Sequence, residues 1–199
     1  MTSLQPDVTL RWVTEFDAAT SASVVALVDC AAAGDRGTLG YASSMTAGQA
    51  QDFIAGLQRR VAAGDAHALY GQVGGMPAMS GVMALTAMPN CRHRAELSKG
   101  VIRPEFRGLR YLQMGLREMV RRAERLGVEQ FVLDVREGSR AQALWKRLGF
   151  RTYGILDDYA RVGGVRYNGH FMVQEVASLR ARLMAGDATP VRRQGCLHA

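Results

Sequence analysis

The sequence contains few cysteines and no long hydrophobic segment. Its 199 residues include only three cysteines, Cys30, Cys91 and Cys196, and none of them belongs to a CxxC pair. A disulfide framework, a zinc site and a nucleophilic cysteine are therefore not expected, and we expect no metal ligands and a reducing, cytoplasmic environment. No run of about 18 apolar residues occurs, so no transmembrane helix is expected. The first residues lack a basic segment followed by an apolar one, which argues against a secretory signal.

Aromatic residues are also sparse, at 7% of the chain, whereas hydrophobic residues reach 48% and charged residues 22%. This composition is typical of a globular protein, and the length allows one domain with a full core. The sequence shows no internal repeat, no low-complexity segment and no linker. It therefore predicts a single domain over residues 1–185, followed by a disordered tail at residues 186–199.

The chain carries an excess of positive charge. Its formal net charge is +7 and its pI is about 9.8, which favours an anionic partner such as nucleic acid or a phosphorylated cofactor. Two arginines, Arg107 and Arg110, precede a predicted helix instead of lying along it. Nucleic-acid binding is the weaker hypothesis, because no basic strand face with interleaved aromatic residues and no recognised binding motif is present. The arginines that fit a solvated helix face are Arg117, Arg121, Arg122 and Arg125.

Hydrophobic periodicity predicts an α/β fold with the element order β α α β β β α β α β β. A mixed central sheet should be flanked by helices, and the strand–helix–strand unit from Glu96 to Val135 should form a right-handed parallel crossover. A tight turn is expected at Gly163–Gly164. The predicted strands are residues 8–13, 67–73, 78–88, 94–102, 130–135, 151–159 and 168–176. The predicted helices are residues 17–33, 46–64, 112–126 and 139–148, with a short one at 177–185.

The stretch "VIRPEFRGLRYL", residues 101–112, places a strand, a turn and a helix start in succession. A helix N-terminus has free N–H groups and a partial positive charge, so the turn before it can hold a phosphate. Arg107 and Arg110 add formal charge, and Gly108 would let a ligand approach the backbone. These residues alone predict an anion site, although basic helix starts are common.

A second segment, "DVREGSRAQALWKRLGF", supports a specific interpretation. Together with the first it resembles the GNAT superfamily of acyl-CoA N-acyltransferases, whose members have a strand ending in V-x-P, then R-G-x-G-x-G/A, and later a helix ending in L-Y-x-K-x-G-F. The two segments look closest to the branch that includes the tabtoxin-resistance acetyltransferases. The resemblance implies a GNAT-like fold, and its specific part runs from about Arg92 to Phe150.

The resemblance also implies a cofactor, acetyl-CoA or another acyl-CoA. The backbone of Val101 and Ile102 would pair with the pantetheine arm, and N–H groups at the helix start would hold the pyrophosphate. A backbone N–H near Val101 would polarise the thioester carbonyl. The residues expected to bind the cofactor are Val101, Ile102, Arg107, Gly108, Leu109, Arg110, Tyr111, Leu112, Ser139 and Trp145.

By the same resemblance the acceptor is the amine of a small molecule, such as an antibiotic or another secondary metabolite, and a homodimer is allowed. The first candidate for the general base is Glu96, and the second is Asp134. Glu96 could instead be a surface carboxylate paired with Arg92 or Arg94. The catalytic candidates are completed by Tyr159, which could line the acceptor pocket with Asp157 and Asp158.

Three positions depart from the family pattern. Arg110 and Leu112 stand where the family has small residues, and Trp145 replaces a tyrosine whose hydroxyl is often proposed to protonate the leaving thiolate. Trp145 could equally be a core residue. Two hypotheses follow. Either the protein is an acetyltransferase with a reshaped CoA site, or the fold serves a different reaction or only binds a ligand.

Overall fold

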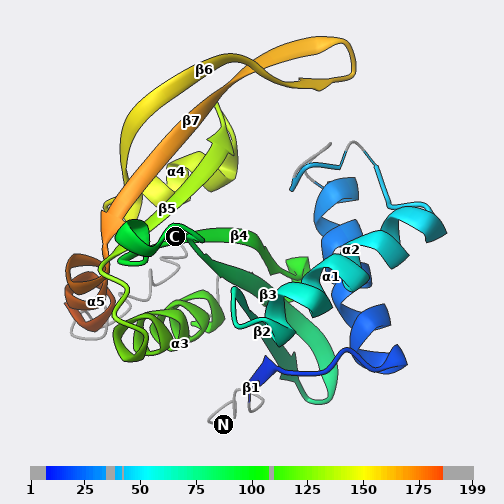
Figure 1. The fold of residues 1–199 in the computed structure, drawn as a ribbon. Coiled ribbons are helices and arrows are strands. Elements are labelled where there is room, and N and C mark those ends of the chain that lie inside the picture. Colours follow the sequence, from blue (N-terminus) through cyan, green and yellow to red (C-terminus); the bar gives the residue numbers. More distant parts are fainter. Residues whose placement is uncertain (1–7, 35–38, 42, 108–109, 186–199) are drawn as a thin grey trace, which may run out of the picture.

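The structure is a computed structural model, and it describes residues 8–34, 39–41, 43–107 and 110–185. One seven-stranded sheet runs through the molecule in the order β1-β2-β3-β4-β5-β7-β6. Helices lie on both faces of this sheet (Figure 1). The observed order of strands and helices confirms the predicted α/β fold with a mixed central sheet.

The first half of the sheet is an antiparallel meander of four strands. The chain forms two helices between the first and second of these strands, and they pack on one face of the meander. At the start of the second helix, Thr46 and Gln49 form a reciprocal capping box. The elements of this half are β1 (Val8–Val13), α1 (Ala18–Gly34), α2 (Ala47–Ala62), β2 (Ala66–Val73), β3 (Met76–Leu85) and β4 (Arg94–Ile102).

Successive side chains along a strand pack alternately into two buried clusters, as expected when both faces of a sheet are covered. On β2, Ala68 and Tyr70 belong to the cluster under α1 and α2, whereas Leu69 between them belongs to a cluster on the opposite face. That opposite face is covered by α3 (Tyr111–Arg125). The central strands are therefore covered by α1 and α2 on one face and by α3 on the other.

The second half of the sheet begins with the predicted crossover. β5 (Gln130–Arg136) follows α3 and lies parallel to β4, which confirms the parallel pairing. β7 (Val165–Glu175) then inserts antiparallel between β5 and β6 (Arg151–Val162). The remaining helices are α4 (Arg140–Arg147) and α5 (Val176–Ala185).

The β6–β7 hairpin is longer than the sequence predicts, and it reaches beyond the rest of the sheet (Figure 1). Both strands continue to the expected turn at Gly163–Gly164, where φ is 57° and 80°. Positive φ at both central residues is the geometry of a two-residue turn that matches the twist of a hairpin. The prediction ended β6 too early and began β7 too late, because the residues next to the turn do not alternate clearly.

Two short 3₁₀ helices were not predicted, and each begins with a proline. They are Pro89–Cys91, between β3 and β4, and Pro104–Phe106, between β4 and α3. The second one occupies the turn that the sequence identified as an anion site. Among the described residues, no helix is both long enough and apolar enough to span a membrane.

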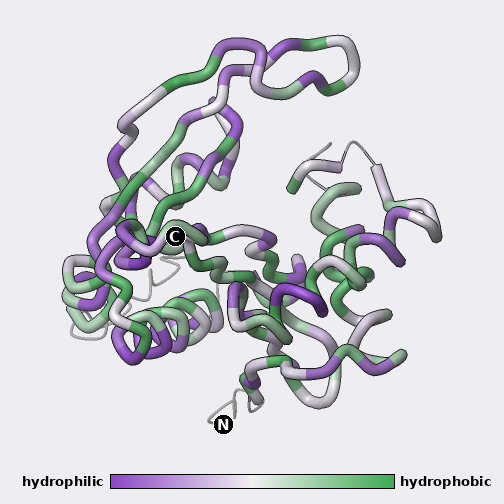
Figure 2. Tube along the Cα trace, in the orientation of Figure 1, coloured by the Kyte–Doolittle hydropathy of each residue, from purple (hydrophilic) through white to green (hydrophobic). Residues whose placement is uncertain are grey.

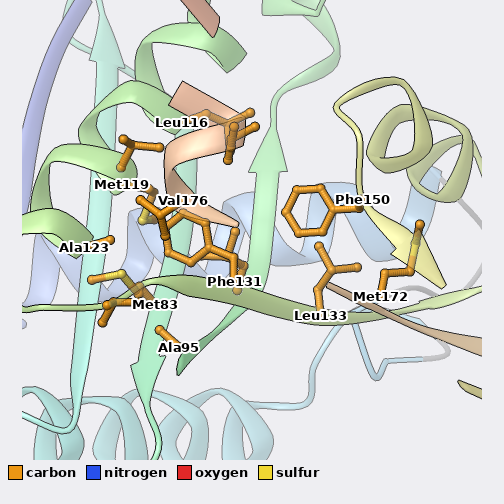
Figure 3. Packing of buried hydrophobic residues seen from close by; sticks show 14 of the residues in the cluster. Met83, Ala95, Leu116, Met119, Ala123, Phe131, Leu133, Phe150, Met172 and Val176 are labelled. Carbon is orange, nitrogen blue, oxygen red and sulfur yellow. The ribbon is translucent and has the colours of Figure 1, made fainter. Parts of the chain in front are cut away.

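The largest buried cluster connects the two halves of the sheet (Figure 3). Met83 of β3 and Met119 of α3 share it with Phe131 of β5 and Met172 of β7, and all four are at most 5% exposed. Phe150, which follows α4, packs into the same cluster. The core therefore holds the second half of the sheet against the first.

The outer side of α3 is hydrophilic, and hydrophilic and hydrophobic residues are mixed along the helix (Figure 2). Arg121 and Arg125 form ion pairs with Glu118. The Arg122 guanidinium lies 4.7 Å from the centre of the Trp12 ring, and Arg117 donates to the Leu183 carbonyl. These contacts within the molecule favour a structural helix face over a nucleic-acid surface.

Candidate functional site

The sheet opens between β4 and β5. Their parallel ladder consists of three pairs, which are Arg94↔Gln130, Ala95↔Phe131 and Glu96↔Val132. Beyond Glu96, β4 continues along β3 and β5 continues along β7, and in the described part of the chain neither strand pairs across the opening. The two strands diverge beyond this ladder (Figure 1), so the edges that face the opening have backbone N–H and C=O groups without a strand partner among the described residues.

A β-bulge shapes the β4 side of this opening. Val82 pairs with Ser98, but Ser80 pairs with Val101, so one extra residue is accommodated on β4. Lys99 lies in this bulge with φ of 52°. As a result, Val101 packs in the cluster under α1 and α2, whereas Leu97 packs on the opposite face.

The Lys99 side chain ties the bulge to the segment that follows α1. Its ammonium donates to the Leu39 carbonyl and lies 5.1 Å from the centre of the Tyr41 ring. Burial lowers the pKa of Lys99, and the nearby charges of Asp134 and Glu96 partly oppose this effect. Lys99 is thus a half-buried cation in the electrostatic field of two candidate catalytic carboxylates.

Tyr159 and Asp134 meet on the other side of the opening, although they are 25 residues apart in the chain. The Tyr159 hydroxyl donates a hydrogen bond to Oδ2 of Asp134. A register shift between Leu156 and Ala160 turns β6 at this point. Within the shift, Asp158 has φ of 51° and binds Arg161, with Nε 2.9 Å from Oδ1. This bulge and its ion pair direct Tyr159 toward β5.

Tyr159 keeps its proton at neutral pH. Burial, the hydrogen bond to Asp134 and the charges of Asp134 and Glu96 all raise the pKa of Tyr159 above its ordinary value. The hydroxyl is therefore a hydrogen-bond donor at this position. It is not suited to act as a base.

Glu96 lies on the same face of the sheet as Asp134. Its neighbours Ala95 and Leu97 are buried on the opposite face, and its ladder partner Val132 is two residues before Asp134. The side chain is exposed. Across the described ranges, Glu96 forms no ion pair with Arg92 or Arg94, so the predicted surface pairing is not observed. Glu96, Asp134 and Tyr159 are therefore close enough to influence one another, and Glu96 remains accessible from solvent.

The predicted anion site lies at the start of α3. Arg110 occupies the position before the first helical residue and makes no side-chain cap, and the first turn contains no acidic residue. The Arg107 guanidinium bonds the carbonyl of Ile102, with Nε 3.1 Å from the oxygen. The predicted residues Gly108 and Leu109 lie outside the described residues. Two arginines thus precede a helix whose N-cap residue makes no side-chain hydrogen bond to its first turn.

Other predicted cofactor residues have structural contacts of their own. Tyr111 is 4% exposed and its ring packs against Phe106. Leu112 and Trp145 pack against the largest core cluster, and the Trp145 ring lies 4.9 Å from that of Phe150. Ser139 caps α4, as predicted, by accepting from the Gln142 N–H. Leu112 and Trp145 are partly buried against the core and Ser139 caps α4, so the backbone at these positions stays a candidate for cofactor contact.

Sequence reasoning missed two residues that shape the site. They are Lys99 and Gly169, neither of which the sequence analysis singled out. Gly169 lies on β7, where the Tyr159 ring packs directly on its backbone. Neither role has a local sequence signal, because each depends on a contact between distant strands. Among the described residues, no cluster of His, Cys, Asp or Glu could hold a metal ion.

Sequence comparison identifies a family for the region that contains the opening. A sequence model of the family described as "Acetyltransferase (GNAT) family" matches residues 50–150. The matched span includes Glu96, Asp134 and the whole of α3. Comparison with curated proteins gave no match.

Several solved structures are similar over most of the chain. The N-acetyltransferase from Staphylococcus aureus Mu50 has a TM-score of 0.69 and 13% identity, covering 85% of this chain and 99% of that one. The yncA protein from Salmonella typhimurium, solved with its cofactor acetyl-CoA, has a TM-score of 0.67 and 17% identity, covering 85% and 94%. The ribosomal-protein-S18-alanine N-acetyltransferase from Escherichia coli has a TM-score of 0.65 and 16% identity, with coverages of 85% and 94%. At these identities the matches show a common fold.

Proposed function

We propose that this chain, which belongs to the acetyltransferase (GNAT) family, transfers an acetyl or other acyl group from acyl-CoA to the amine of a small molecule. The class of acceptor includes antibiotics and other secondary metabolites. The observation that carries the proposal is the opening between β4 and β5, beside which Tyr159 is bonded to Asp134 and Glu96 is exposed. An amine and a thioester could meet at this point.

The residues of the opening fit acyl-CoA. The edge of β4 that faces away from β3 has no strand partner beyond Glu96 within the described chain, so it can bond the amide groups of a pantetheine arm. The start of α3 has no acidic residue and is preceded by Arg107 and Arg110, which suits a pyrophosphate. A protein of the same fold, yncA, was solved with acetyl-CoA.

The carboxylates would bind and deprotonate the amine. Glu96 and Asp134 attract an ammonium ion, and Glu96 is exposed, so it can pass the proton to solvent. When bound, acyl-CoA supplies the acyl group: a C–N bond to the amine forms, the C–S bond of the thioester breaks, and of the two protons that the ammonium loses one goes to the CoA sulfur and one to solvent.

Tyr159 would act as a donor in the same site. Its raised pKa keeps the hydroxyl protonated, and the hydrogen bond to Asp134 fixes its position. Asp134 already accepts this bond with one oxygen, which leaves Glu96 as the better base. Trp145, where the family often has a tyrosine, packs against the largest core cluster, and its indole N–H is not a usable acid for this proton transfer.

The experiment that tests the proposal is calorimetric titration of the protein with acetyl-CoA, followed by an assay of CoA thiol release with a panel of amines. We expect binding, and we expect Glu96→Gln to lower turnover about 10²-fold or more if Glu96 is the base. Glu129→Gln, the same change at an exposed glutamate just before β5, is the matched control and should not change turnover.

Two results would contradict the proposal. If neither acetyl-CoA nor CoA binds at millimolar concentration, the fold serves another reaction or ligand. If Glu96→Gln turns over at the rate of the unchanged protein, Glu96 is removed from the mechanism, while CoA binding would still support acyl transfer.

A further inference from the structure

Aromatic side chains gather beside Asp134 on the open face of β5, β7 and β6. Phe171 is the ladder partner of Asp134 and therefore lies on the same face. The ring centre of Phe171 is 6.4 Å from that of Tyr153 and 6.4 Å from that of Tyr159. Phe171 thus connects an outer ring, Tyr153, with the hydroxyl that contacts Asp134.

These rings are not explained by the core. None of the three belongs to or packs against a buried hydrophobic cluster, within the limits of the described residues. Tyr153 is 57% exposed. The helices α1 and α2 pack on β2, β3 and β4, and no described helix covers this face of β6 and β7. The fold therefore presents an aromatic surface to solvent next to the candidate catalytic carboxylates.

The charges around the rings have a definite order. Asp134 and Glu96 both influence Tyr159, and these two carboxylates outnumber the one ammonium, Lys99, that lies in their field, so the inner end of the aromatic row is net negative. Arg136, two residues after Asp134 on the same face of β5, lies 4.7 Å from the centre of the Tyr167 ring. A cation is attracted to the carboxylates and to the faces of the rings, and it is repelled from Arg136.

Resting on the proposed function, we propose that the acceptor is an amine joined by a short linker to an aromatic or other flat apolar group. The ammonium lies at Asp134 and Glu96, and the flat group packs on Phe171 and Tyr153. Ring-to-ring contacts of this kind favour offset or edge-to-face packing, which the tilted arrangement of Tyr153 and Phe171 permits. Phe171 then determines specificity, and Asp134 binds the charge.

The test is calorimetric titration of the full chain without acyl-CoA, using three probes. 2-Phenylethylamine has the ring and the positive charge, n-butylamine has only the charge, and 3-phenylpropanoate has the ring with a negative charge. We expect 2-phenylethylamine to bind about tenfold more tightly than either of the others. Phe171→Leu should remove this advantage without changing the affinity for n-butylamine, and Asp134→Asn should weaken the binding of both amines.

Phe16→Leu is the matched control, because Phe16 is a partly buried phenylalanine that packs in the cluster under α1 and α2. It should leave all three affinities unchanged. Equal affinity for the two amines, or an unchanged advantage in Phe171→Leu, would overturn the proposal. A dimer in sedimentation that Phe171→Leu dissociates would also overturn it, since the face would then be an interface between copies. Acyl-CoA is absent from this titration, so a failure to bind acetyl-CoA in the separate experiment would contradict acyl transfer and leave the amine result unaffected.

Discussion

At the scale of single residues, the position of Tyr159 depends on a glycine. A Cβ atom at position 169 would lie 2.2 Å from Cγ and 2.5 Å from Cδ2 of Tyr159. Gly169 does not have a positive φ, so its backbone would accept alanine. The glycine is therefore needed for space, and the space is what lets the Tyr159 hydroxyl reach Asp134.

Gly169→Ala should displace the Tyr159 ring and break its hydrogen bond to Asp134. We expect a loss of turnover of about tenfold or more, because small displacements of reacting groups are costly. Ultraviolet titration of tyrosine should also show one tyrosine ionising closer to the ordinary value than before. The matched control is Gly154→Ala on β6, where a Cβ atom meets nothing within 4 Å. If Gly169→Ala and Gly154→Ala have the same turnover and the same tyrosine titration, Gly169 does not position Tyr159.

Tyr159 also makes stability depend on pH in a defined direction. Its pKa is raised in the folded protein, so above the unfolded value of about 10 the folded state holds a proton that the unfolded state loses. The stabilising contribution is complete below pH about 10 and is lost as the pH rises further. The free energy of unfolding of Tyr159→Phe should therefore fall less steeply above pH 10 than that of the unchanged protein.

Urea unfolding between pH 8 and pH 11 would measure this difference. Tyr153→Phe, on the same strand but exposed, should keep the slope of the unchanged protein. If Tyr159→Phe has that slope too, the hydroxyl is not held as the structure indicates.

At the scale of elements, two β-bulges build the site. The bulge at Lys99 transfers Val101 to the face of α1 and α2, and the bulge at Asp158 turns Tyr159 toward β5. A regular strand alternates its side chains strictly, so each bulge changes which side chains reach the opening. Neither residue is a glycine, and their left-handed backbone is maintained by contacts of Lys99 with Leu39 and of Asp158 with Arg161.

The start of α3 makes a prediction about charge. If Arg110 replaces lost backbone contacts with an electrostatic attraction, Arg110→Ala should weaken CoA binding about fivefold at low ionic strength. The difference should shrink as salt is added, because exposed charges are screened. Calorimetry at two salt concentrations measures both effects.

Arg121→Ala is the control on the same helix, because Arg121 is already paired with Glu118. It should change CoA affinity little at either salt concentration. Tighter binding by Arg110→Ala would mean that Arg110 obstructs the cofactor instead of attracting it.

At the scale of the whole molecule, the two halves of the sheet are joined by three ladder pairs between β4 and β5 and by the largest core cluster. That cluster contains residues from β3, α3, β5 and β7. If one half of the sheet unfolded, it would expose the buried side chains of the other half. An opening that admits a ligand is thus compatible with a single cooperative structure.

The two tryptophans test this cooperativity, because one lies in each half. Trp12 is on β1, with its indole nitrogen 2.8 Å from Oε1 of Glu118, and Trp145 is on α4. In Trp145→Phe the tryptophan fluorescence comes from Trp12 and reports on the first half. In Trp12→Phe it comes from Trp145 and reports on the second half. The urea midpoint from fluorescence in each variant should coincide with the midpoint from its own circular dichroism. Midpoints that differ would show that the halves unfold separately.

Much of the fold could be predicted, because hydrophobic periodicity and glycine-terminated helices are local signals. The order of elements, the parallel β4–β5 pair and the cap at Ser139 were all predicted. The site was predicted less completely. Glu96, Asp134 and Tyr159 were expected from the family resemblance, and the structure brings Tyr159 and Asp134 into contact, but their catalytic roles stay predictions.

The sequence by itself determined the family segments, the basic turn before α3 and the alternation that assigns Asp134 to one face of β5. Only the tertiary structure decided that Tyr159 reaches Asp134, that Lys99 lies within the field of both carboxylates, and that Phe171 has a ring on either side. The physical reason is that periodicity is set within an element, by residues a few positions apart. Bulges, and the absence of a side chain at Gly169, act only when strands distant in sequence pack together.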